Sequence, residues 1–140
     1  MRQFLILMFF GLLISGCKSK PVNQTIDKKK EGIWIDNYEQ DSIKYKSVEQ
    51  YKHDEPVKKW KSYIDGKIYK TEKYKNGICT VKYYYKNGKL QSKGKTKIET
   101  DTNEMHWFYF GDWKFYSEKG KLIEIKKYNK GELIFEQEIK

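Results

Sequence analysis

Apolar and polar residues alternate along most of the chain with the period of two that belongs to β-strands. Val81 and Tyr83 fall on one side of an extended chain while Lys82 falls on the other, and Trp113 likewise points away from Lys114. These alternating runs last about seven or eight residues, which is an ordinary strand length. No segment after the first sixteen residues shows helical periodicity. The pattern therefore predicts an all-β domain.

Glycines mark the ends of these runs at a regular interval. Gly66, Gly77 and Gly88 are eleven residues apart, as are Gly120 and Gly131, and several follow an aspartate or asparagine. Short turns of this kind join antiparallel neighbours, since parallel pairing needs long crossovers. We expect an elongated antiparallel β-meander of stacked hairpins, with a curled sheet or partial barrel as the alternative.

The N-terminus has a different pattern. Arg2 is followed by the apolar run 4–14, which would rise about 16 Å as a helix and is too short for the roughly 30 Å core of a bilayer. A positive residue, a short apolar run and then small residues are typical of a secretory signal peptide, which we place at residues 1–16. Residues 17–31 have few apolar and no aromatic side chains. We expect them to form a flexible tether before a domain that occupies residues 32–140.

The segment Ile14-Ser15-Gly16-Cys17 resembles the lipobox of bacterial lipoproteins, in which an aliphatic residue and two small residues precede a cysteine. The resemblance implies a lipid on the Cys17 sulfur, cleavage before Cys17 and acylation of the new amine, which would anchor the chain in a membrane of the bacterial cell envelope. Lys18 stands where the inner-membrane retention signal of some lipoproteins is an aspartate. By that analogy we expect the outer membrane, at its periplasmic face or at the cell surface. An ordinary secretory signal, with Cys17 a bystander, is the alternative.

The glycine spacing is part of a longer repeat. The segment 66–77 matches 120–131 at every defined position: glycine, lysine, an aliphatic residue, five residues, tyrosine, two residues and glycine. The stretch 111–122, with glycine, tryptophan, tyrosine and then glycine-lysine-leucine, resembles the MORN repeat, particularly the variant of bacterial antitoxin-like proteins. The copy that contains Trp60 is one residue short before its glycine, and residues 101–105 look inserted. The resemblance implies a twisted antiparallel meander, MORN-like, whose hairpins stack through their aromatic side chains.

The charge of the chain comes almost entirely from lysine on its positive side. There are 29 basic and 19 acidic residues, for a net charge of +10, and Arg2 is the one arginine. Nucleic-acid recognition favours the planar fork of arginine, and the lysines are scattered among acids, so we expect no nucleic-acid binding. We interpret the lysines as serving solubility, protection of strand edges and weak attraction to anionic lipid. Cys79 would be the one thiol left after lipidation of Cys17, and we expect it to be a small buried residue.

Groups for catalysis are sparse. The two histidines are His53, which we expect in a solvated loop before Pro56, and His106, which lies in the most apolar stretch of the domain. Adjacent residues on a strand point to opposite faces, so His53-Asp54-Glu55 is a poor set of metal ligands. The sequence shows no glycine-rich phosphate loop, no serine elbow and no cysteine–histidine pairing. We expect no enzymatic activity, no metal and no cofactor.

Tyr83, Tyr85, Tyr109 and Tyr116 are candidate binding residues, because exposed tyrosines beside lysines can stack on sugar rings or anchor a protein partner. Burial in the repeat core is the simpler interpretation of the same residues. The anchor, the tether and the repeats together suggest a non-catalytic lipoprotein that binds or scaffolds a protein partner in the envelope. Alternatives are an immunity or antitoxin lipoprotein that neutralises a toxin, and a carbohydrate-binding envelope protein. The sequence leaves the oligomeric state open.

Overall fold

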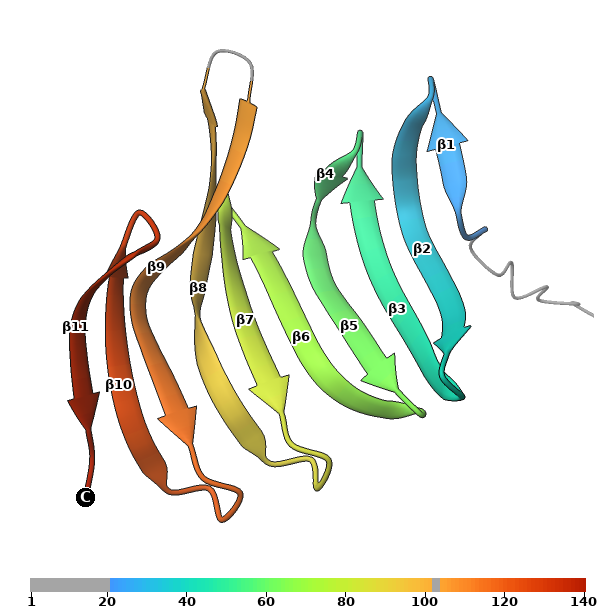
Figure 1. Cartoon of the computed structure of the whole chain (residues 1–140). Coiled ribbons are helices and arrows are strands. Elements are labelled where there is room, and N and C mark those ends of the chain that lie inside the picture. The colour runs from blue at the N-terminus through green and yellow to red at the C-terminus, as the bar shows by residue number, and fades with distance from the viewer. Residues whose placement is uncertain (1–20, 102–103) are drawn as a thin grey trace, which may run out of the picture.

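The computed structural model describes residues 21–101 and 104–140 (Figure 1). Over these residues the chain forms one open antiparallel sheet of 11 strands. It contains no helix there, and so none with the length and apolarity needed to cross a bilayer. The all-β class and the antiparallel meander expected from the sequence are thereby confirmed. The expected signal peptide, residues 1–16, and the expected lipidation site, Cys17, lie outside the described residues.

The strands follow one another across the sheet in the order of the sequence, except that the short β4 pairs with the end of β3 and lies off this path. The β8–β9 hairpin, which contains the segment that looked inserted, projects beyond its neighbours (Figure 1). The strands are β1 (Gln24–Ile26), β2 (Lys29–Gln40), β3 (Ile43–Lys52), β4 (Glu55–Pro56), β5 (Lys58–Ile64), β6 (Lys67–Lys75), β7 (Ile78–Tyr84), β8 (Leu90–Asp101), β9 (Glu104–Tyr116), β10 (Leu122–Asn129) and β11 (Glu132–Glu138).

The sheet begins earlier than the sequence suggested. β1 starts at Gln24 and β2 at Lys29, both within residues 17–31, which we expected to be a flexible tether. The Asn23 side chain extends this pairing: its Nδ2 donates to the Ile35 carbonyl at 3.0 Å, and its Oδ1 accepts from the Ile35 N–H at 2.6 Å. Backbone and amide hydrogen bonds thus order a polar segment that has no apolar face to bury. Its hydropathy therefore did not reveal the strand.

Left-handed backbone conformations occur at the turns that the glycine spacing predicted. Asp65 and Gly66 form a two-residue turn between β5 and β6, with φ of 47° and 76°. The turn between β9 and β10 is longer. Within it the Ser117 N–H donates to the Lys121 carbonyl and the Gly120 N–H donates to the Ser117 carbonyl, each at 2.8 Å. Trp60 pairs with Glu72 and Trp113 with Lys126, so the hairpin that contains Trp60 is one residue shorter between the paired positions, which matches the copy that is one residue short before its glycine.

The core lies on one face of the sheet, which we call the aromatic face. Its buried apolar residues are Cys79, Val81 and Trp113. Half-buried aromatic side chains pack around them: Tyr74, Tyr83, Tyr109, Phe115 and Tyr128. Lys82, next to Val81 on β7, is exposed on the opposite face, as the alternation predicted.

Trp113 can be buried in a single-layer sheet because Gly94 leaves room for its ring. A Cβ atom built on Gly94 would lie closer than 3.0 Å to three indole carbons, so the ring rests directly on the backbone of β8. The indole N–H donates to the Lys95 carbonyl at 3.0 Å. The contact with the backbone and the surrounding rings together leave Trp113 only 3% exposed.

Candidate functional site

An aromatic row crosses the first half of the sheet on the aromatic face. Ring centroids lie 6.3 Å apart for Trp34 and Tyr51, 4.9 Å for Tyr51 and Trp60, and 4.8 Å for Trp60 and Tyr74. The Trp60 indole N–H donates to the Gln50 carbonyl at 2.9 Å. Burial raises the pKa of the Tyr51 and Tyr74 hydroxyls above their ordinary range. These half-buried rings pack on one another across β2, β3, β5 and β6.

The four tyrosines predicted as binding residues lie in two places. Tyr83 and Tyr109 pack against the core on the aromatic face, where the Tyr109 ring centroid is 4.5 Å from that of Trp113. Tyr85 and Tyr116 lie at neighbouring hairpin ends, and the Tyr85 hydroxyl donates to the Tyr116 carbonyl at 2.7 Å. The structure therefore brings Tyr85 and Tyr116 together but does not join the four residues into one exposed row.

The remaining candidates for chemistry stand apart from one another. Cys79 is 3% exposed, as expected, and burial raises the pKa of its thiol. His53 lies in the turn before β4, where its backbone N–H donates to the Glu31 carboxylate at 2.8 Å. His106 is exposed on β9 and pairs in register with Glu99. Within residues 21–101 and 104–140, no group of three or more histidine, cysteine, aspartate or glutamate side chains could hold a metal ion.

The face opposite the core carries a dense group of lysines on the inner strands β5–β9. Residues directly opposite one another in neighbouring strands share a face. The register gives one row that runs across all five strands through Lys61, Thr71, Lys82, Lys93 and Lys114. A second row runs beside it through Lys59, Lys73, Thr80 and Lys95. We call the lysines of these two rows the lysine face: Lys59, Lys61, Lys73, Lys82, Lys93, Lys95 and Lys114.

Several of these lysines directly oppose another lysine across two strands: Lys59 and Lys73, Lys82 and Lys93, and Lys93 and Lys114. Opposed like charges destabilise a sheet, by roughly 0.7 kcal/mol for unit charges about 6 Å apart in water. Two lysines of the aromatic face are paired with glutamates. Lys70 Nζ lies 3.0 Å from the Glu72 carboxylate, and Lys126 Nζ lies 3.2 and 3.0 Å from those of Glu124 and Glu136. Among the residues that the structure describes, no ion pair joins a carboxylate to a lysine of the two rows, although Asp112 lies near Lys93, Lys95 and Lys114. Beside the rows on β8, Lys97 Nζ lies 2.7 Å from the Glu99 carboxylate.

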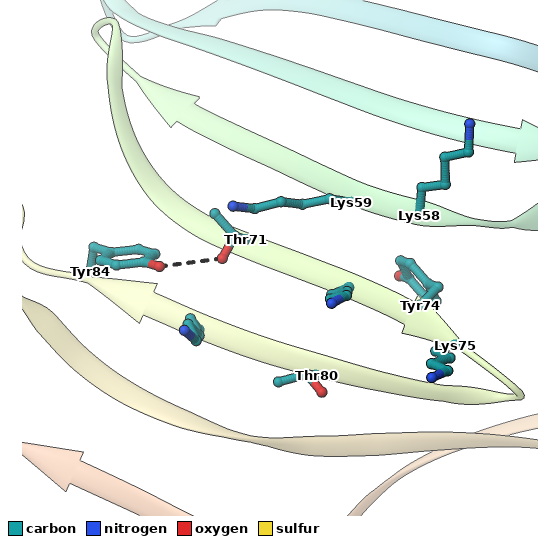
Figure 2. A pocket seen from close by; sticks show the side chains of 9 residues that line it. Lys58, Lys59, Thr71, Tyr74, Lys75, Thr80 and Tyr84 are labelled. Atoms are coloured by element: carbon teal, nitrogen blue, oxygen red, sulfur yellow. Dashed lines mark hydrogen bonds between the residues drawn. The ribbon is translucent and has the colours of Figure 1, made fainter.

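Open hollows lie over the lysine face. One, of about 720 Å³, contains the hydroxyls of Thr71, Thr80 and Tyr84 among five lysines, and none of its described lining residues is acidic (Figure 2). The lysines are Lys58, Lys59, Lys73, Lys75 and Lys82. Thr71 Oγ1 and the Tyr84 hydroxyl share a hydrogen bond of 3.4 Å. A second hollow, of about 150 Å³, is lined by Lys93, Lys95 and Lys114 together with Thr80, Gly94 and Asp112. Ammonium groups beside hydroxyl donors are suited to binding anions such as carboxylates.

Sequence reasoning missed the lysine face because the register between strands decides which lysines are neighbours. Alternation places Lys82 opposite to Val81, but only the pairing of β7 with β8 sets it beside Lys93. The expected role in protecting strand edges does not apply to these lysines, since β5–β9 are inner strands of the sheet. The sequence does show lysines at alternate positions on successive strands. The pairing between strands is needed, however, to tell which of these lysines are neighbours.

One edge of the sheet is apolar. All seven residues of β11 are exposed, and Leu133, Ile134 and Phe135 keep 47%, 55% and 49% of their surface accessible. β11 pairs with β10 on its inner side, and no strand among the described residues pairs with its outer side. A row of unpaired backbone groups beside exposed apolar side chains is a template for a further strand.

The chain matches no model of a protein family, and comparisons with curated proteins and with solved structures give no match either. The fold defines its class: an open, single-layer antiparallel β-meander with an aromatic face, a lysine face and an apolar edge strand. The likeness to MORN repeats and to lipoproteins stays a prediction from the sequence.

Proposed function

We propose that this chain is a membrane-anchored, non-catalytic binding protein of the bacterial cell envelope, and that its sheet engages a protein partner by strand addition at β11. The observation that carries the proposal is the apolar edge strand. Natural sheets commonly protect an edge with charges, bulges, proline or a short strand. β11 has Glu132, Glu136 and Glu138 and a register shift at Ile134, but its centre still holds Leu133, Ile134 and Phe135 in succession. An edge left open in this way favours pairing with another chain.

The residues of β11 indicate what kind of partner strand would fit beside it. An extended segment would complete the outer hydrogen bonds of β11, which supplies affinity, while pockets for alternate side chains supply specificity. Leu133 pairs with Tyr128 and Phe135 with Lys127, which lie on opposite faces of β10, and the register shifts at Ile134 between them. A partner strand would therefore present apolar side chains on both faces. Glu132 and Glu136 flank the apolar centre, and Glu138 ends the strand. A partner with lysine or arginine at the ends of its strand would match these charges.

The anchor rests on the lipobox-like sequence ending at Cys17. Several acyl chains on this residue would hold the chain stably, since each buried methylene contributes about 0.8 kcal/mol. Metabolic labelling with palmitate is expected to modify the wild-type chain and not a Cys17→Ala variant, and the variant is expected in the soluble fraction with its fold unchanged. Labelling of the variant, or a variant that stays in the membrane, would refute the anchor.

Strand addition is tested in intact cells with a photo-crosslinking amino acid at Ile134. Ile68 is a matched control, because it is also an exposed isoleucine, at 37%, but belongs to the inner strand β6. We expect a discrete protein adduct from Ile134 and none from Ile68. Equal adducts from both positions, or none from Ile134, would contradict strand addition. If the captured protein is a toxin, the partner-binding function is that of an immunity protein.

A further inference from the structure

We infer that the lysine face is a second binding surface and that it receives an acidic segment of a protein. Three pairs of its lysines oppose one another across strands, an arrangement that costs folding stability, and Asp112 is the one acidic residue among the described residues that line the two hollows over it. The same chain pairs Lys70 and Lys126 with glutamates on the aromatic face. Carboxylates from another molecule would neutralise the repulsion, and so charge complementarity identifies the ligand as anionic.

The composition of the two rows favours a protein segment over other polyanions. Arg2 is the one arginine of the chain, so the planar forks that recognise nucleic-acid phosphates and bases are missing from the lysine face. The first row continues beyond its lysines into Val48 on β3 and Ile125 on β10, both half-buried. A charged centre between apolar ends matches a folded or extended polypeptide, which has both kinds of side chain. A layer of lipid headgroups would meet only the charged part.

The spacing of the lysines suits an extended acidic segment. Neighbouring strands lie about 4.8 Å apart, and residues two apart on one strand are separated by about 6.6 Å, so the ammonium groups form a two-row grid. An acidic segment that crosses β5–β9 would meet both rows, with the hydroxyls of Thr71, Thr80 and Tyr84 as further donors. Lysine ammonium groups on flexible stems can adapt to carboxylates that are not strictly periodic.

This surface is separate from the edge strand of the proposed function. The lysine face belongs to β5–β9, and β10 lies between it and β11. A partner could therefore occupy either surface alone, and the two proposals can fail independently.

The test uses the full chain in neutral detergent micelles with a short fluorescent poly-glutamate peptide as the probe. The face variant is Lys73→Gln/Lys82→Gln/Lys93→Gln, and the control is Lys119→Gln/Lys121→Gln/Lys140→Gln, which removes the same charge from exposed residues outside the two rows. Anisotropy is expected to show roughly tenfold weaker binding by the face variant, from modest contributions of exposed charge pairs, and less than about a twofold change for the control. Added salt should weaken the wild-type affinity.

A second readout keeps the result interpretable. A carbodiimide reagent joins a glutamate carboxylate to a lysine amine that lies against it, and mass spectrometry is expected to place these links on Lys73, Lys82, Lys93 or their row neighbours. The face variant should melt no lower than the wild type, because glutamine removes like-charge repulsion. Equal weakening in both variants, or links outside the lysine face, would overturn the inference. So would tighter binding of an oligonucleotide of equal charge, or displacement of the peptide by micelles that contain phosphatidylglycerol.

Discussion

Gly94→Ala is the substitution that tests the core of this sheet most directly. The new Cβ would lie within 3.0 Å of Cδ2, Cε2 and Cγ of Trp113, so the indole would have to leave the backbone of β8. Backbone conformation is not the obstacle, because Gly94 is absent from the positions with positive φ. Overpacking costs about 1–3 kcal/mol, and loss of the indole hydrogen bond to Lys95 costs about 0.5–1.5 kcal/mol. We expect a total of about 1.5–4.5 kcal/mol, or a fall in Tm of roughly 6–18 °C.

The assay is thermal unfolding followed by circular dichroism, in a double-mutant cycle with Trp113→Leu. Leucine is smaller than the indole, so Gly94→Ala should cost about 1–3 kcal/mol less in that background. Gly66→Ala is the control: its φ is 76°, and nothing lies within 4 Å of an added Cβ. Its cost of about 1–2 kcal/mol comes from left-handed backbone alone and should be additive with Trp113→Leu. If Gly94→Ala costs less than about 0.5 kcal/mol, or the same in both backgrounds, the Trp113–Gly94 contact does not exist.

Further predictions concern other parts of the aromatic face. Because burial raises the pKa of Cys79, a thiol reagent should modify it at least roughly a hundredfold more slowly in the folded Cys17→Ala variant than in urea; equal rates would show that the thiol is exposed. Burial also raises the pKa of Tyr51 and Tyr74, so their contribution to stability should hold below the ordinary pKa of 10.0 and be lost as the pH rises above it. Alkaline titration of tyrosinate absorbance should accordingly show a late-ionising fraction, and a single transition near pH 10.0 would contradict it. Trp60→Phe should lower the free energy of unfolding in urea by about 1 kcal/mol, because the indole hydrogen bond is lost, and Trp60→Ala should lower it by about 3–5 kcal/mol. Equal losses for the two variants would show that packing of the ring does not stabilise the sheet.

Much of the fold could be predicted because its causes are local. A two-residue alternation defines a strand and its two sides, and a glycine in left-handed conformation after aspartate or asparagine defines a short hairpin turn. Asp65-Gly66 and Asn76-Gly77 behave in this way. The first strand escaped prediction because its stability does not come from hydrophobic burial. Asn23, which binds both backbone groups of Ile35, reads in the sequence as an ordinary polar linker residue.

The sequence by itself determined the strands after the first, their turns, their antiparallel order and which side chains alternate across them, since each of these depends on neighbours within a few residues. Only the tertiary structure decided the register between strands. That register sets Lys82 between Lys93 and Thr71, places Gly94 beneath Trp113 and separates the four candidate tyrosines into two sites. Because a shift of one residue would move every side chain to the other face, the surfaces of this protein depend on contacts between residues far apart in the chain.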